Sequence, residues 1–363
     1  MTGRAVVTGI GCVSPAGIGG KDVALALSDP SRTVPEFRVP DFPLEDHIGN
    51  ARLFRRVAPA TRFALAAVSL AVRDAGLPIG PDGLSRTAVV VGATHGAINF
   101  STQFFREYLQ DGPEGASPML FSESVLNATA GNVAIAFGVR GPVHTLIGEE
   151  TVGAQVLSTA LSLLRCGIVD RCIVAGAEER GAIIENAYRQ MDRATRRSGV
   201  DGGNPPQQGE GAAALVIESP EAAERRGAVL RVPVLFCRCA RDPRRPVETT
   251  VTGMVGRELA TLQEGAGDVS HIVLPTGRNR EPATRGALRA MGNRAGGIRR
   301  IDITPRIGNP FGAASMFQMA VSTASLASGP ASGKGLVLSS GVEGSISLAC
   351  FGTAPGACRE GDR

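Results

Sequence analysis

The feature that most constrains the fold of this chain is a regular alternation of short β-branched runs with longer Ala- and Leu-rich segments of helical periodicity. In the first half, the strand-like runs are residues 5–11, 87–93, 143–149, 171–177 and 212–219. The helical segments between them are residues 60–76, 152–167 and 180–191. This alternation predicts an α/β fold, in which helices cover the faces of a sheet.

The second half of the chain repeats the same order of elements. Its strand-like runs are residues 231–240, 271–277, 300–305, 334–340 and 345–351. Its helical segments are residues 282–291 and 312–327. The repetition predicts an internal duplication, with residues 1–225 and 226–363 as the two halves of one compact unit. The Arg-, Gly- and Pro-rich stretch at 192–209 predicts a surface loop.

Composition argues against a membrane protein and against a nucleic-acid-binding protein. Hydrophobic residues make up 43% of the chain and charged residues 20%. No apolar run approaches the roughly 18 residues that a bilayer-spanning helix needs. The chain begins with a strand-like run rather than a signal peptide, so we expect a cytoplasmic protein. The net charge of +4 gives little electrostatic attraction for nucleic acid.

Neither the cysteines nor the histidines follow the spacing of a metal site or a catalytic pair. The cysteines include no CxxC motif and lie mostly among apolar residues, which predicts buried free thiols. His95 and His144 lie in or near strand-like runs, whereas we expect His47 and His271 to be exposed. All four histidines are therefore predicted to be structural, with no metal ion and no cofactor.

Four segments, in order along the chain, carry a family resemblance. They are VVTGIGCVSPAG at 6–17, NATAGNVAIAFGVRGP at 127–142, IVDRCIVAGAEE at 168–179 and GEGAAALVIES at 209–219. Together they resemble successive landmarks of the β-ketoacyl synthases. The resemblance implies the thiolase-type fold of that family, a duplicated five-layer α-β-α-β-α architecture.

The position of the catalytic nucleophile departs from the family pattern. In active members, the strand after a Gly-Pro pair ends at a cysteine that begins a buried helix, and the helix N-terminus stabilises the acyl-accepting thiolate. Here that stretch reads GPVHTLIGEETVGAQ and places Glu150 at the position of the cysteine. A carboxylate gains from the same helix dipole, but it cannot readily form the thioester that elongation requires.

The two histidine positions that the family uses also differ. The resemblance places Pro275, or Thr276 if the register shifts by one residue, at the first position and Asn309 at the second. Neither Pro275 nor Thr276 can act as a general base near neutral pH, and Asn309 can donate a hydrogen bond but cannot shuttle a proton. Val342 and Glu343 replace the central residues of the C-terminal glycine turn. These departures predict a ketosynthase fold that has lost its condensation chemistry.

Two roles for Glu150 stay open at this point. In one, Glu150 replaces the nucleophile and props open or closes the former pocket, as a mimic of an acyl or malonyl carboxylate. In the other, it only caps the N-terminus of a helix.

The segment THGAINFSTQFFREYLQDGP at 94–113 resembles the part of chain length factors that crosses a dimer interface and closes the end of the partner's acyl tunnel. The resemblance implies that Ile98, Ser101 and Phe105 line that tunnel. Their spacing puts them on one face of a helix, and a bulky Phe105 would shorten the space for a growing chain. The alternative is that all three are ordinary core residues.

The resemblance therefore implies a non-catalytic, chain-length-factor-like subunit of a bacterial type II polyketide synthase. Its expected partners are an active ketosynthase, in a heterodimer, and an acyl carrier protein. A cluster of arginines is a candidate carrier-protein contact, with a solvated helix face as the alternative. It comprises Arg52, Arg55, Arg56 and Arg62.

Two enzymatic alternatives stay open. The first is a malonyl-carrier-protein decarboxylase, similar to initiation-type family members that replace the cysteine but keep both histidines. The second is a divergent acyltransferase that uses Cys12 or Ser339. No nucleic acid, membrane or metal ion is expected among the partners.

Overall fold

The computed structural model describes residues 5–79, 84–197, 207–230, 232–262, 268–329 and 333–353. Its strands are β1 (Val6–Ser14), β2 (Gly17–Gly19), β3 (Thr87–Ala93), β4 (Val143–Ile147), β5 (Arg171–Glu178), β6 (Gly211–Glu218), β7 (Val232–Arg241), β8 (Val269–Val273), β9 (Arg299–Ile301), β10 (Lys334–Ser340) and β11 (Ser345–Gly352). Its helices are α1 (Lys21–Leu27), α2 (Pro59–Asp74), α3 (Ile98–Asp111), α4 (Pro118–Ser124), α5 (Ala128–Phe137), α6 (Val152–Arg165), α7 (Ala182–Arg197), α8 (Pro220–Arg225), α9 (Val247–Leu262), α10 (Arg280–Met291), α11 (Thr304–Ile307) and α12 (Ala314–Ser328).

The strands repeat one topology twice. The first set has the order β4-β3-β5-β6-β1, and the second set, counted from the opposite edge, has the order β9-β8-β10-β11-β7. In each set the parallel strands come first, and the last two strands are antiparallel to their neighbours. A short antiparallel pairing of Val6 and Val7 with Pro233 and Val232 joins the two sets through β1 and β7.

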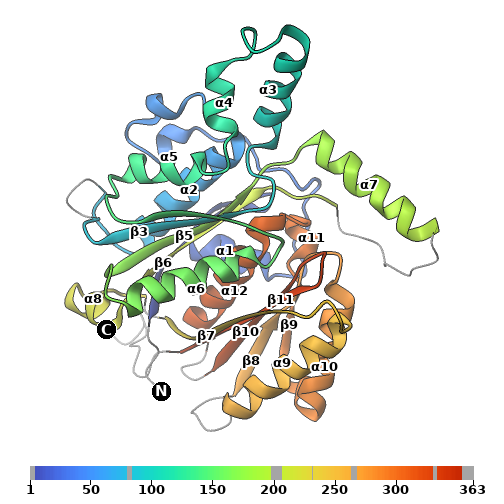
Figure 1. Cartoon of the computed structure of the whole chain (residues 1–363). Coiled ribbons are helices and arrows are strands. Elements are labelled where there is room, and N and C mark those ends of the chain that lie inside the picture. Colours follow the sequence, from blue (N-terminus) through green and yellow to red (C-terminus); the bar gives the residue numbers. More distant parts are fainter. Residues whose placement is uncertain are drawn as a thin grey trace.

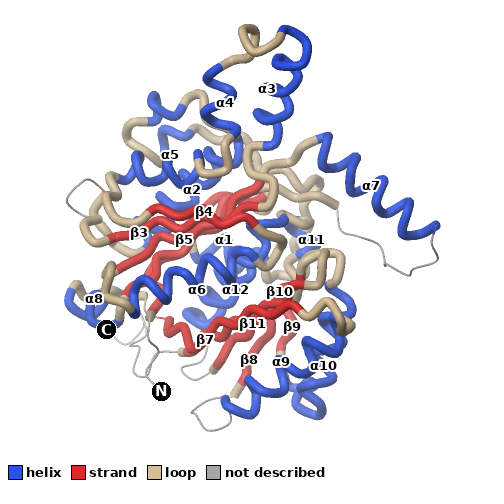
Figure 2. The backbone as a smooth tube through the Cα atoms, viewed as in Figure 1, coloured by secondary structure: helices blue, strands red, loops and turns tan. Residues whose placement is uncertain are grey.

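The helices form three layers around these two layers of strands (Figure 1). Helices α1, α6 and α12 lie between the strand layers, α2 and α5 cover the outer face of the first, and α9 and α10 cover the outer face of the second. Figure 2 shows the two strand layers as separate red bands. The predicted thiolase-type α/β fold, with its α-β-α-β-α layers, is confirmed.

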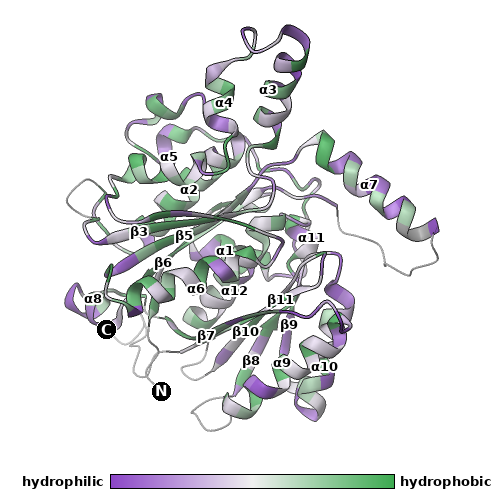
Figure 3. Ribbon diagram, viewed as in Figure 1, coloured by the Kyte–Doolittle hydropathy of each residue, from purple (hydrophilic) through white to green (hydrophobic). Residues whose placement is uncertain are grey.

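Hydrophobicity explains this arrangement, because the strands and the central helices carry most of the apolar residues (Figure 3). Most of α12 is buried, as a helix covered on every side requires. Small residues let α6 and α12 approach each other closely: a Cβ atom at Gly153 would lie 2.4 Å from Ser315 Oγ. This contact fixes the start of α6 against the first turn of α12. No helix of the described ranges is both long enough and apolar enough to cross a membrane.

Two local predictions were wrong. His271, expected to be exposed, is 4% exposed within β8, and its Nε2 lies 2.9 Å from Ser322 Oγ on α12. Helix α7 continues to Arg197 and so occupies the first part of the predicted loop at 192–209. Residues 198–206 of that loop lie outside the described residues.

Candidate functional site

Glu150 lies at the start of the central helix α6. Strand β4 ends at Ile147 and α6 begins at Val152, so the residues between them form the entry to the helix. The Glu150 side chain is 3% exposed. A helix N-terminus favours a negative charge, which helps to hold a carboxylate at this buried position.

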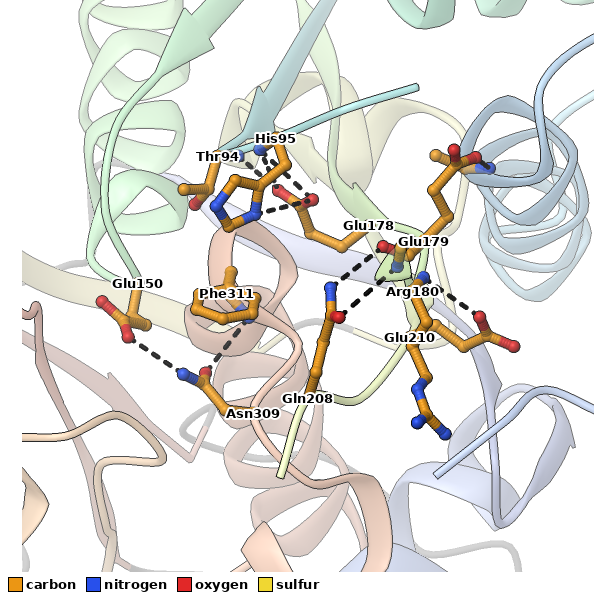
Figure 4. A network of polar contacts seen from close by, with 12 residues as sticks. Thr94, His95, Glu150, Glu178, Glu179, Arg180, Gln208, Glu210, Asn309 and Phe311 are labelled. Atoms are coloured by element: carbon orange, nitrogen blue, oxygen red, sulfur yellow. Dashed lines mark hydrogen bonds and ion pairs between the residues drawn. The ribbon is translucent and has the colours of Figure 1, made fainter. Parts of the chain in front are cut away.

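The structure brings Glu150 and Asn309 into contact (Figure 4), with Thr276 beside Asn309. Asn309 donates a hydrogen bond from Nδ2 to Glu150 Oε1 over 3.0 Å, and the Thr276 hydroxyl lies 3.5 Å from Asn309 Oδ1. Pro275 is buried next to Thr276. At Gly277 a Cβ atom would lie 2.7 Å from Glu150 Oε1, so this turn packs directly against the carboxylate.

Burial controls the acidity of Glu150. It raises the pKa of the carboxyl group above its usual value, and the negative charge of Glu149 acts in the same direction. The hydrogen bonds from Asn309 and from the backbone of Val342 lower the pKa in part. The Asn309 oxygen accepts a hydrogen bond from the Phe311 backbone N–H over 3.1 Å, which leaves the side-chain amide nitrogen directed at Glu150.

The preceding residue, Glu149, binds the turn between β10 and β11. Its Oε2 accepts hydrogen bonds from the Glu343 backbone N–H over 2.9 Å and from the Ser345 hydroxyl over 3.0 Å. Glu150 Oε2 accepts one from the Val342 backbone N–H over 3.3 Å. We call Glu149 and Glu150 the glutamate clamp, because together they hold the turn between β10 and β11. The sequence analysis identified Glu150 but missed Glu149, although an acidic pair before a helix was the available signal.

Replacing Glu150 by alanine should destabilise the chain by about 1–3 kcal/mol, because the Asn309 amide and the Val342 N–H each lose an acceptor in a buried place. Glu150→Gln keeps an acceptor oxygen and should lose less. Urea unfolding of both variants at neutral pH measures the difference. Equal stability of Glu150→Ala and the wild-type chain would contradict the role of the clamp.

A cavity of about 400 Å³ opens beside Glu150 and Asn309. Helix α7 forms much of its wall through Ile184, Tyr188 and Asp192, which recur every four residues along one face. Asp192 forms an ion pair with Arg278. The sequence analysis did not assign α7 to the site, although this spacing was visible in it. The remaining lining residues are Arg180, Glu185, Arg189, Gln207, Gln208, Arg278 and Phe311.

Phe311 lines the cavity and packs against the partly buried His95. Its ring lies 4.7 Å from the ring of His95 and 4.8 Å from that of Tyr188, and its φ of 40° is rare for a residue with a side chain. Burial lowers the pKa of His95 to about 4. Behind His95, the fully buried Glu178 accepts hydrogen bonds from the backbone N–H groups of Thr94 and His95. His95 is therefore neutral at neutral pH, and its ring is packed among aromatic rings.

The predicted tunnel residues Ile98, Ser101 and Phe105 all lie on α3, as their spacing indicated. No residue of α3 is buried, and Phe105 is 59% exposed. The alternative of ordinary core packing is therefore wrong for Phe105 within this chain. Further exposed apolar side chains lie on α3 and on the segment that follows it up to α5, namely Tyr108, Leu109, Met119, Phe121, Val125 and Leu126.

The four arginines of the predicted cluster differ in their surroundings. Arg52, Arg55 and Arg56 are exposed around a short 3-10 turn before α2. Arg62 instead donates a hydrogen bond to the carbonyl oxygen of Phe42, and its guanidinium group lies 5.1 Å from the centre of that ring. Three of the four side chains are therefore free to meet a partner, while Arg62 contributes to internal packing.

The two nucleophiles considered for an acyltransferase lie away from the cavity. Cys12 is fully buried in β1, and burial raises the pKa of its thiol. Ser339 is also buried and donates a hydrogen bond to Gln318 Oε1 over 2.6 Å. Neither lines the cavity. The prediction of buried thiols holds for Cys12, Cys172 and Cys350, is wrong for the exposed Cys166 and Cys239, and for Cys358 falls outside the described residues.

Comparison with known proteins places this geometry in a family. A model of the beta-ketoacyl synthase N-terminal domain matches residues 3–223. The 3-oxoacyl-(acyl-carrier-protein) synthase 2 of Rhizobium meliloti (strain 1021) is 28% identical over 267 residues, which are 64% of this chain and 63% of that protein. The match thus spans less than two thirds of the length of this curated relative.

Solved structures share the fold over nearly the whole chain. The ishigamide ketosynthase/chain length factor superposes with a TM-score of 0.75 at 24% identity, over 96% of this chain and 99% of the other. AntDE:AntF, a type II PKS acyl-carrier protein in complex with its ketosynthase, superposes with a TM-score of 0.77 at 17% identity, over 97% of this chain and 100% of the other. Because the family model covers more than half of the sequence, the chain belongs to the beta-ketoacyl synthase family.

Proposed function

We propose that this chain is a non-catalytic ketosynthase-like subunit of the chain-length-factor type, which pairs with an active ketosynthase and shapes its polyketide or polyene tunnel. The observation that carries the proposal is the hydrogen bond between Glu150 and Asn309. It joins a carboxylate to an amide at the positions where condensation needs a thiolate and an imidazole. A ketosynthase/chain length factor with the same fold supports the assignment.

The chemistry of the cavity favours this role over condensation. Among the described residues that line the cavity, none is a cysteine or a histidine. Both Glu150 oxygens already accept hydrogen bonds, and burial raises the pKa of this carboxyl group. Burial raises the pKa of the Tyr188 hydroxyl to about 12, so it stays protonated at neutral pH. Glu150 would therefore occupy the former nucleophile position, held by its hydrogen bonds to Asn309 and Val342, without supplying a nucleophile.

An exposed apolar face supports pairing with a ketosynthase. Strand β4 is the terminal strand of its set, so its outer edge can accept another strand. Val143 and Ile147 on β4 are 41% and 47% exposed, and Phe105 and further exposed apolar side chains lie on α3 and α4. Exposed large apolar side chains gathered on a few elements are typical of protein interfaces. In the heterodimer, Ile98, Ser101 and Phe105 would line the partner's tunnel.

The carrier protein is the second proposed partner. Acyl carrier proteins are acidic, and the exposed Arg52, Arg55 and Arg56 offer a complementary basic surface, with Arg62 holding the segment behind them.

We further infer a cytoplasmic location. We also treat residues 1–225 and 226–363 as two halves of one unit, which meet where β1 pairs with β7.

Co-expression with an active ketosynthase encoded by an adjacent gene tests this function. We expect a one-to-one complex by size-exclusion chromatography with light scattering, and poor solubility of the chain expressed alone, because the apolar face is then uncovered. After incubation with acyl-loaded carrier protein, mass spectrometry should find the acyl group on the partner only. A monodisperse chain that forms no complex, or covalent acylation of this chain, would refute the proposal.

The same preparation separates this role from that of a malonyl-carrier-protein decarboxylase. A decarboxylase needs a donor for the enolate oxygen that forms when carbon dioxide leaves. Asn309 stands where the family resemblance places a histidine, and one of the two N–H groups of its amide already donates to Glu150. We therefore expect no carbon dioxide release from malonyl-loaded carrier protein when the chain is purified with a partner whose nucleophilic cysteine and active-site histidines have been replaced.

A further inference from the structure

Helix α7 carries a stripe of arginines on its exposed face. Arg189, Arg193 and Arg197 recur every four residues, so they follow one another at intervals of about 6 Å along the helix axis. All three are exposed, and Figure 1 shows α7 reaching outward from the body of the chain. We propose that this stripe docks an acidic helix of the acyl carrier protein, an inference that rests on the proposed function for the identity of that partner.

The two acidic side chains of α7 are turned toward the body of the chain instead. Asp192 forms an ion pair with Arg278, and Glu185 forms one with Arg180. Both carboxylates belong to residues that line the cavity beside Glu150. The negative charges of α7 are therefore neutralised on its inner side and do not offset the arginines on its outer side.

The arginines of the stripe lack carboxylate neighbours. Arg193 and Arg197 form no ion pair within the described residues, and Arg189, at the rim of the cavity, donates a hydrogen bond to Asn186 Oδ1 over 3.3 Å. Two arginines of α10, by contrast, share the carboxylate of Glu248. The outer face of α7 thus presents positive charge that only a partner can neutralise, and a partner with complementary charge is steered to such a face.

Exposed apolar side chains and a hollow accompany the stripe. Ile183 and Met191 of α7 are 53% and 39% exposed. A second cavity, of about 370 Å³, lies between α3 and the start of α7, and both Ile183 and the exposed Arg106 of α3 line it. An amphipathic partner helix can therefore bury apolar side chains against α7 while its carboxylates meet the arginines.

The position of α7 favours a protein partner over a membrane. A basic amphipathic helix can also bind anionic lipid, but it then inserts its apolar face among the acyl chains. Here Ile184 and Tyr188 of that face line the cavity, and the Tyr188 ring lies 4.8 Å from the ring of Phe311. The side left for a partner is mainly charged, and an acidic helix with carboxylates four residues apart repeats at the same interval of about 6 Å.

Fluorescence anisotropy of labelled carrier protein, titrated with the full chain in its ketosynthase complex, tests the docking site. The double variant Arg193→Glu/Arg197→Glu should raise the dissociation constant about 10-fold or more at low ionic strength, because like charges then face each other. Added salt should weaken the binding of the wild-type chain more than that of the variant, since exposed charge pairs are screened. A carrier protein whose acidic residues on one helix are replaced by lysine should bind the variant more tightly than the wild-type chain.

Arg225→Glu/Arg300→Glu is the matched control, because both arginines are exposed, form no ion pair in the described part of the chain and change the net charge by the same amount. Arg52→Glu/Arg55→Glu probes the other basic surface in the same assay. Thermal unfolding verifies that each variant is folded. Size-exclusion chromatography with light scattering should find the ketosynthase complex for every variant, so a failure of pairing, which would refute the proposed function, is distinguishable from a failure of docking.

A loss of carrier affinity in the α7 variant that exceeds the loss in the matched control supports the docking site, and so does rescue by the lysine-bearing carrier protein. Equal affinities of the α7 variant and the control would overturn it, as would binding that depends on Arg52 and Arg55 alone. The absence of carrier binding by the wild-type complex counts against it too. Arginine-dependent binding to phosphatidylglycerol vesicles in place of the carrier protein would assign α7 to a membrane instead.

Discussion

The Glu178→Gln variant is expected to gain about 4 kcal/mol in free energy of unfolding, relative to the wild-type chain, when the pH is raised from 4.5 to 8. Glu178 is fully buried at the end of β5. Burial raises its pKa from 4.5 to about 8, although backbone N–H groups of Thr94, His95 and Gly96 donate hydrogen bonds to it. The nearby imidazole of His95 is neutral in most of this range and supplies no compensating charge.

The sign follows from the direction of the pKa change. The folded chain keeps the Glu178 proton up to about pH 8, whereas the unfolded chain releases it above about pH 4.5. The unfolded state therefore binds fewer protons in this window, and the stability of the wild-type chain falls as the pH rises through it. Glutamine has no proton to release. Its different hydrogen bonds therefore change the free energy of unfolding by an amount that does not depend on pH.

Urea unfolding at several pH values between 4.5 and 8.5 measures this effect, with the difference between variant and wild type as the readout. Titration of other groups, such as His271, is common to both chains and cancels in that difference. Glu36→Gln, at an exposed position, is the control and should follow the wild-type curve. Parallel curves for Glu178→Gln and wild type would contradict a buried, protonated Glu178.

Much of the fold could be predicted from local patterns, because strands and central helices are selected by hydrophobicity. The run at 87–93 coincides with β3, and the runs at 334–340 and 345–351 match β10 and β11 to within a residue. These segments are buried on both faces, so nearly every residue in them is apolar or small. Periodicity likewise identified most of α6 and α12.

The sequence predictions were wrong where a residue far away in the sequence determines the local structure. His271 is buried because Ser322, about fifty residues away in sequence, offers a hydrogen bond across the α12 interface. Helix α7 extends into a stretch predicted as a loop, since Asp192 binds Arg278 and arginine is a good helix former. Helix α9 was not predicted, because Thr and Gly interrupt its apolar pattern and packing on α10 stabilises it instead.

The candidate site, too, could be predicted only in part. Motif register was enough to propose Glu150 and Asn309 as neighbours, and the structure places these two in hydrogen-bond contact, whereas no such contact involves Pro275 among the hydrogen bonds of the described residues. The acidic pair before α6 was visible in the sequence, but its contacts with the β10–β11 turn were not, since they depend on how far that turn reaches toward α6. Local sequence encodes which side chains are present, but the relative position of two halves of a fold determines which of them meet.

The second prediction with a large expected effect concerns the edge of β4. Replacing Ile147 by lysine should raise the dissociation constant of the ketosynthase complex about 30-fold or more. The substitution places a charge on an apolar edge that pairing would bury, and an uncompensated buried charge at an interface costs about 2–5 kcal/mol. Ile147 is 47% exposed in the chain alone, so the substitution should leave the fold intact.

Ile79→Lys provides the matched control, because Ile79 is also 47% exposed but lies in the segment after α2 rather than on the edge strand. Isothermal titration calorimetry with the partner measures both variants, and thermal unfolding monitors their stability. If the edge of β4 is the pairing surface, only Ile147→Lys should weaken binding, and its melting temperature should stay near that of the wild-type chain. Equal weakening by both substitutions would point to a general charge effect, and unchanged binding of Ile147→Lys would move the interface away from β4.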